Sequence, residues 1–133
     1  MIDVETEIFS YIATALRSEY QGIYVASEKR RMPTKYPAVQ IVEMSNVTSQ
    51  DTSDSGTNEN HADVMYEVNV FSNLASGAKL EAKAIMGFID DLFLEKGFVR
   101  QLLEPVDNAD SSFYRYLARY IARIGKDNVI YQR

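Results

Sequence analysis

Apolar and polar residues alternate most clearly in the stretch 62–71, which reads ADVMYEVNVF. The apolar residues of one face recur with a period of two, and their β-branched or aromatic types favour a strand. These residues are Val64, Tyr66, Val68 and Val70. Met65 and Phe71 fall on the other face, so the pattern favours a central strand over a solvated edge strand.

Two segments instead space their apolar residues as helices do. Residues 2–19 carry acids in the first turn and Arg17 near the end, an arrangement that suits the helix dipole. The segment from Ser76 to Lys96 is followed by Gly97, a residue type common just after a helix end. Its predicted apolar stripe consists of Leu80, Ala84, Ile85, Phe88, Ile89 and Leu92.

The remaining β-prone segments are short or ambiguous. Residues 23–27 and the run AVQIVEM at 38–44 have strand character, as does the segment 98–103 that precedes Pro105. Residues 113–124, FYRYLARYIARI, fit both the strand and the helix period, so periodicity alone does not decide between them.

A strand is favoured for residues 113–124 because a turn follows it. Gly125–Asn128 form a four-residue turn signal that leads into the β-prone Val129–Gln132, which predicts a terminal hairpin.

The order of these elements predicts an α+β fold, with a mainly antiparallel β-sheet, two α-helices packed on one face and a long polar hairpin loop. The loop is the polar run from Ser45 to His61. It is long for a connection within a domain, because most connections have no more than roughly 12 to 15 residues. With strands on both sides it is compatible with an extended hairpin arm. At 133 residues the chain is expected to form a single domain, 1–133.

Composition and charge narrow the function. Hydrophobic residues make up 46% and charged residues 25%, which is ordinary globular usage. The formal net charge of −5 argues against a protein that grips nucleic acid by neutralising phosphates. Early acids at Asp3, Glu5 and Glu7, and the lack of an apolar run of about 18 residues, predict a soluble protein made in the cytoplasm.

Residues capable of catalysis or metal binding are sparse. The chain has no cysteine, and His61 is its single histidine, so a nucleophile–histidine triad would depend on one residue in a polar segment. Four acids gather in and beside that segment: Asp51, Asp54, Glu59 and Asp63. They do not match a calcium loop, because Ala62 stands where the bidentate glutamate belongs. The sequence therefore predicts a non-enzyme without cofactor or metal.

Several sequence segments resemble those of one family of phage proteins. The segments are PAVQIVEM, NENHADVMYEVNVFSN, GAKLEAKAIMGFIDDLFLEKGF, YRYLARY and the C-terminal IYQR. From about Val25 onward, the chain resembles the small tail-completion or tail-terminator proteins encoded in the head-to-tail module of long-tailed bacteriophages and of prophages in Gram-positive bacteria.

That resemblance implies a structural subunit of the virion. Such proteins form a ring, usually of six copies, on the head-proximal end of the tail tube, where the ring stops tube polymerisation and offers a surface for head joining. The implied partners are copies of the chain itself, the major tail tube protein and the head-tail connector or head-closure protein. No sequence-specific nucleic acid and no membrane are implied. By position, Ser45 to His61 would be the main contact segment.

A closed ring joins two different patches of each subunit. The strand interpretation of residues 113–124 places three arginines on one face, and the acidic loop could meet that face on a neighbour. The candidate interface residues are Asp51, Asp54, Glu59, His61, Arg115, Arg119 and Arg123. Under this hypothesis, reversing Arg115 and Arg119 to Glu weakens ring formation.

Two other classes of function stay open at this stage. One is a different subunit of the same module, such as a head-closure, connector-adaptor or minor tail protein, which would bind a different neighbour. The other is a small cytoplasmic α+β enzyme or ligand-binding domain, which would need an apolar pocket with convergent polar groups.

Overall fold

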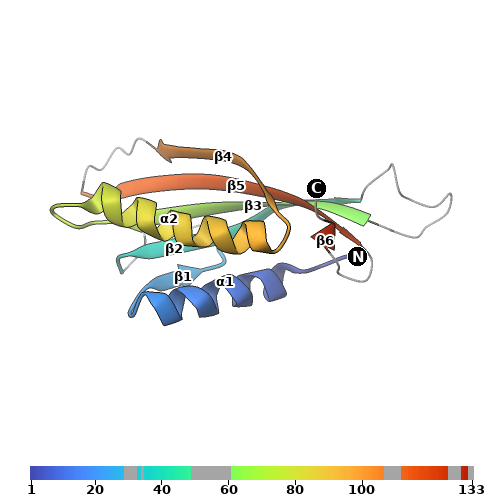
Figure 1. The fold of residues 1–133 in the computed structure, drawn as a ribbon, viewed down its shortest axis with the longest axis horizontal. Helices are drawn as coiled ribbons and strands as arrows, with labels where there is room; N and C mark the ends of the chain where they lie inside the picture. The colour runs from blue at the N-terminus through green and yellow to red at the C-terminus, as the bar shows by residue number, and fades with distance from the viewer. Residues whose placement is uncertain (29–32, 34, 49–60, 107–111, 126–129, 132–133) are drawn as a thin grey trace.

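A computed structural model describes residues 1–28, 33, 35–48, 61–106, 112–125 and 130–131. These residues form the predicted α+β fold, with two helices beside one mainly antiparallel sheet (Figure 1). In chain order the elements are α1 (Glu5–Glu19), β1 (Tyr24–Ala26), β2 (Ala38–Thr48), β3 (His61–Ser72), α2 (Ala78–Glu95), β4 (Val99–Val106), β5 (Tyr114–Gly125) and β6 (Ile130–Tyr131).

The strands follow the order β1-β2-β3-β5-β4, and β6 also pairs with β5. β3 therefore lies between two long strands, which confirms the central strand predicted from its two apolar faces. β5 confirms the strand interpretation of the ambiguous segment, and β6 pairs with it in antiparallel fashion. The short β1 is parallel to β2, and the other pairings are antiparallel.

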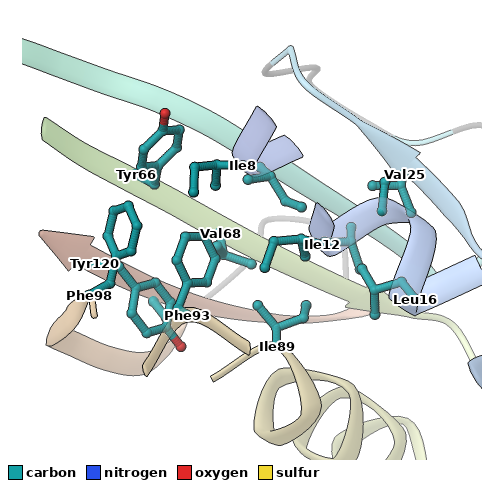
Figure 2. Close-up of a cluster of buried hydrophobic side chains, with 14 of the residues drawn as sticks. Ile8, Ile12, Leu16, Val25, Tyr66, Val68, Ile89, Phe93, Phe98 and Tyr120 are labelled. Atoms are coloured by element: carbon teal, nitrogen blue, oxygen red, sulfur yellow. The ribbon is translucent and has the colours of Figure 1, made fainter. Parts of the chain in front are cut away.

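Both helices pack on the same face of the sheet, as predicted (Figure 1). Figure 2 shows side chains from α1 and α2 directed toward the strands, where they meet the apolar side chains of β3 and β5. The core residues labelled there are Ile8, Ile12, Leu16, Val25, Tyr66, Val68, Ile89, Phe93, Phe98 and Tyr120. This burial is the main source of stability, because an isolated helix of this length is marginal in water.

Helix α1 begins at Glu5, three residues later than predicted. The cause is local: a side-chain oxygen of Asp3 accepts a hydrogen bond from the Glu5 N–H at 3.1 Å, a turn that holds the preceding residues outside the helix. Ile2 and Val4 are nevertheless buried in the core, so their apolar character reflects packing before the helix starts.

Helix α2 ends in a Schellman motif. Gly97 has a φ of +95° and its N–H donates to the Leu94 carbonyl at 3.0 Å, while the Phe98 N–H donates to the Phe93 carbonyl at 3.0 Å. The accompanying apolar contact is present, since the Phe93 and Phe98 rings lie 5.1 Å apart at 80°. Gly97 thus turns the chain directly into edge strand β4, as its place in the sequence predicted.

The core-facing stripe of α2 differs from the predicted one. Its buried members are Ala82, Ile85, Met86, Ile89 and Phe93, which follow helical spacing i, i+3, i+4, i+7 and i+11. Leu80 was expected in the stripe but is 75% exposed, and Ala84 is also exposed. The Ile85–Ile89–Phe93 line fixes the rotation of the helix, and Leu80 falls on the opposite side.

Strand β2 continues beyond its predicted end at residue 44. Ser45–Thr48 pair with Ala62–Met65 of β3 after an irregularity in register near residue 44. The Asn46 side chain also donates to the Ile2 carbonyl at 2.7 Å, which ties the extension to the N-terminal segment. These residues were assigned to a loop because they are mostly polar, whereas the pairing with β3 makes them a strand.

Strand β4 also runs further than predicted, through Pro105. A proline is compatible with a strand at this position, because β4 lies at the edge of the described sheet and the missing N–H breaks no inner ladder.

The centre of the core is an aromatic cluster formed by Tyr66, Phe93, Phe98 and Tyr120 (Figure 2). Each tyrosine hydroxyl reaches a carboxylate at the cluster margin, Tyr66 at 3.1 Å from Glu43 and Tyr120 at 2.7 Å from Asp90. Burial is the largest cause that raises the pKa of both tyrosines, and the adjacent carboxylate raises the pKa further.

Candidate interaction surface

The face of the sheet opposite the helices carries a row of charged pairs. Along β3 and β5 alternate side chains point away from α1 and α2, and neither described helix covers them. The antiparallel register sets Asp63 opposite Arg123 and Glu67 opposite Arg119. We call this surface the outer face.

Glu67 is the centre of a hydrogen-bonded network on the outer face. Its side chain is only 2% exposed, and its carboxylate accepts from the Arg119 guanidinium at 3.2 and 3.3 Å and from the Asn69 amide at 3.0 Å. Asn69 in turn accepts from Arg115 Nε at 2.8 Å. A buried carboxylate is tolerated when charge-assisted hydrogen-bond donors satisfy it. Arg115 and Arg119 therefore stabilise the fold of their own chain.

The second pair lies nearer the ends of β2 and β3. Arg123 Nε and a terminal nitrogen lie 2.9 and 3.3 Å from the two oxygens of Asp63, a bidentate arrangement. Both side chains are partly exposed, at 30% and 45%, so solvent screens this pair more than the Glu67 pair.

Between and beside the two pairs lies a patch that we call the apolar band, formed by Val47, Met65, Val99 and Ile121. Met65 is opposite Ile121, which is opposite Val99 on β4, while Val47 lies beside Asp63. Val47 is 58% exposed and Val99 is 39% exposed. A hollow of about 240 Å³ opens here between Val47, Met65 and Ile121.

The other end of the outer face is closed by the chain itself. Phe71 is buried beneath Phe113, with ring centroids 5.7 Å apart, and Phe113 lies 6.0 Å from Tyr36. The Arg115 guanidinium lies 5.6 Å from the Phe71 ring centroid, within cation–π range. Exposed apolar area on this face is therefore concentrated at the end that carries the apolar band.

The structure places part of the sequence-predicted interface. Asp51, Asp54 and Glu59 lie outside the described residues. His61 was assigned to the polar segment but is a strand residue, because β3 begins at His61, which pairs with Gly125. Asp63, which lies beside that segment, falls in the strand predicted for residues 62–71.

The three arginines lie together on the outer face as expected, but with side-chain partners in β3. The pairing of Arg119 with Glu67 and of Arg123 with Asp63 was not predicted, although the four-residue spacing of these acids matches that of the two arginines in an antiparallel neighbour. The double reversal of Arg115 and Arg119 is also a poor test of assembly, because a glutamate at position 119 would face the buried Glu67 carboxylate.

Within the described ranges, no group of three or more histidine, cysteine or acidic residues is arranged to hold a metal ion. Over the same part of the chain, no helix is both long and apolar enough to span a membrane.

Comparison with known proteins adds fold information only. No protein-family model and no curated protein matches this sequence. One solved structure superposes with a TM-score of 0.63 over 90% of this chain and 92% of that chain, at 11% sequence identity. At that identity the likeness shows a shared fold and nothing about activity or partners.

We expect Arg119→Ala to destabilise the protein by about 2–3 kcal/mol, because it removes the cationic partner of a buried carboxylate. The matched change Arg123→Ala should cost within about 1 kcal/mol, since its partner Asp63 remains solvated. Urea unfolding followed by circular dichroism measures both free energies. Equal costs would contradict the central role assigned to Glu67.

Proposed function

We propose that this protein is a structural subunit of the tail-completion or tail-terminator kind. It assembles as a closed ring, with six copies the expected number, at the head-proximal end of a long phage tail. There it stops tube growth and provides the surface for head joining. Its partners are neighbouring copies, the tail tube protein and the head-tail connector.

The observation that carries the proposal is the apolar band. Val47 and Val99 expose apolar side chains next to the half-buried Met65 and Ile121, and the bidentate Asp63–Arg123 pair flanks them. An apolar centre with a charged rim is the usual anatomy of a protein–protein interface. The band lies on the outer face, which neither described helix covers, so a neighbouring subunit can approach it.

The same geometry suits a heterologous contact. The outer face is closed by aromatic side chains at the Phe71 end and open at the apolar band, so its two ends are chemically different. A ring needs two different patches per subunit, whereas a twofold dimer needs a single self-complementary patch. The resemblance of several sequence segments to tail-completion or tail-terminator proteins is the reason to place such a ring on a phage tail.

The test is electron microscopy of particles from an induced host that lacks this gene. Filled heads beside unattached tails, with tails of irregular or excessive length, are expected if the protein terminates and joins the tail. Intact particles with normal tails would overturn the proposal. Unattached tails of normal length would instead indicate another subunit of the same module.

Complementation of that host tests the apolar band itself. We expect the double variant Val47→Lys/Val99→Lys to lower the yield of joined particles at least tenfold, because two ammonium groups would be desolvated in the contact. The ammonium group introduced at position 47 would face Asp63 across the strands, so the fold should be retained. Leu80→Lys is the matched control, since Leu80 is 75% exposed on α2, on the helix side of the sheet. Equal yields from the two variants would remove the band from the interface.

A further inference from the structure

A second hollow, of about 190 Å³, lies between α2 and the edge strand β4. It is on the helix-covered side of the sheet and is therefore distinct from the apolar band. Six of its lining residues carry the argument: Lys83, Met86, Gly87, Asp90, Arg100 and Leu103.

Gly87 leaves part of the lining of the hollow without a side chain. Glycine is disfavoured inside a helix relative to alanine, so its presence calls for a spatial reason. No close packing requires it, because a Cβ added at Gly87 would meet nothing within 4 Å. The missing side chain leaves open space in a hollow whose lining also includes the apolar side chains of Met86 and Leu103.

The rim of the hollow is positively charged. Lys83 is exposed and has no hydrogen bond or ion pair within the described part of the chain. Arg100 is 44% exposed and lies 3.3 Å from Asp90, whose carboxylate also accepts from the Tyr120 hydroxyl. Arg100 is therefore already paired with Asp90, and together with Lys83 the charged residues that line the hollow carry one net positive charge, on a chain with a formal net charge of −5. This excess of positive charge favours a ligand that carries carboxylates.

Size selects the kind of ligand. Pockets for small molecules usually enclose about 300–1,000 Å³, and this hollow is smaller than that range. It suits a single apolar side chain, and Met86 can adapt its shape to that side chain. One well-filled pocket of this kind often dominates a protein–protein contact.

We propose that this hollow is a docking site for an acidic segment of another protein. One leucine-sized side chain of that segment fills the space over Gly87, and carboxylates beside it pair with Lys83 and Arg100. The site is separate from the apolar band, and its test does not depend on the proposed ring.

The experiment is an NMR titration of the ¹⁵N-labelled protein with the blocked tripeptide Glu-Leu-Glu. Saturable shifts should be confined to amides of α2 near Gly87 and of β4, with a Kd on the order of 1 mM. The blocked tripeptides Lys-Leu-Lys and Glu-Ser-Glu should bind at least tenfold more weakly, because one lacks the charge match and the other lacks the anchor. No shifts with Glu-Leu-Glu, or equal affinity for Lys-Leu-Lys, would overturn the proposal.

Two variants locate the site. Gly87→Leu fills the hollow from within and should abolish the shifts while raising the Tm by about 2–4 °C, since leucine is the better helix former. Lys83→Glu should weaken binding at least tenfold, whereas Lys79→Glu, an exposed lysine one turn earlier that does not line the hollow, should leave it unchanged. Shifts that persist in Gly87→Leu would overturn the site. Shifts at the same amides with protein concentration alone, lost in Gly87→Leu, would make the occupant a second copy and overturn an outside partner.

Discussion

Replacing Phe93 with alanine should destabilise the protein by about 3–5 kcal/mol, the range found when a buried phenylalanine is removed. Phe93 is fully buried, and its ring stacks on Tyr120 with centroids 4.4 Å apart and planes within 5°. It also makes an edge contact with Phe98 at 5.1 Å and lies 6.1 Å from Tyr66. Deletion of the ring therefore leaves a cavity that three other aromatic side chains border (Figure 2).

The loss is large relative to the total stability of about 5–15 kcal/mol that a domain has. Urea unfolding monitored by circular dichroism at one pH gives the free energy directly. Phe88→Ala is the matched control, because Phe88 is on the same helix but is only half-buried. Its ring contacts Tyr20, with centroids 5.7 Å apart, and is not part of the aromatic cluster. A cost for Phe93→Ala no greater than that of the control would contradict the aromatic cluster as the centre of the core.

The position of Phe93 shows what helical periodicity could and could not predict. The existence of α2 and its end just before Gly97 follow from the spacing of apolar residues and from one glycine, both local signals. The rotation of the helix was mispredicted because Leu80 is as apolar as the residues of the true stripe. Only the sheet decides the rotation, since Phe93 must reach Tyr120 of β5, which is distant in sequence.

The sheet was predicted best where burial produces alternation. The central strand β3 shows the period of two on a face that the helices cover. Ser45–Thr48 of β2 lack that signal because none of these residues is buried, so only pairing with Ala62–Met65 reveals the strand.

The charged pairs of the outer face depend on register in the same way. Asp63, Glu67, Arg119 and Arg123 are visible in the sequence, but which acid meets which arginine follows from the β3–β5 pairing. Without that register, Arg119 looks like a surface charge available to a neighbour. With it, Arg119 is the main cationic partner of a buried carboxylate, so the candidate contact shifts to the apolar band.

The two tyrosines of the aromatic cluster should make stability strongly pH-dependent above about pH 10, the ordinary tyrosine pKa. Burial, with Glu43 beside Tyr66 and Asp90 beside Tyr120, raises the pKa of both hydroxyls in the folded state. The folded state then keeps two protons that the unfolded state releases. Stability is therefore fully present below the unfolded pKa and falls as pH rises above it, by about 3 kcal/mol per pH unit for the pair.

Urea unfolding between about pH 9 and pH 11, a range that brackets the unfolded tyrosine pKa, measures this slope. The double variant Tyr66→Phe/Tyr120→Phe should be less stable than the wild type at pH 9 by about 1 kcal/mol for each lost hydrogen bond. Its stability should then fall less steeply, so the two curves converge as pH rises. An independent readout is the ultraviolet absorbance of tyrosinate, in which two of the nine tyrosines should ionise only when the protein unfolds. If all nine ionise while circular dichroism stays native, Tyr66 and Tyr120 are not sealed in the core, and the carboxylate contacts that position them would have to be reassigned.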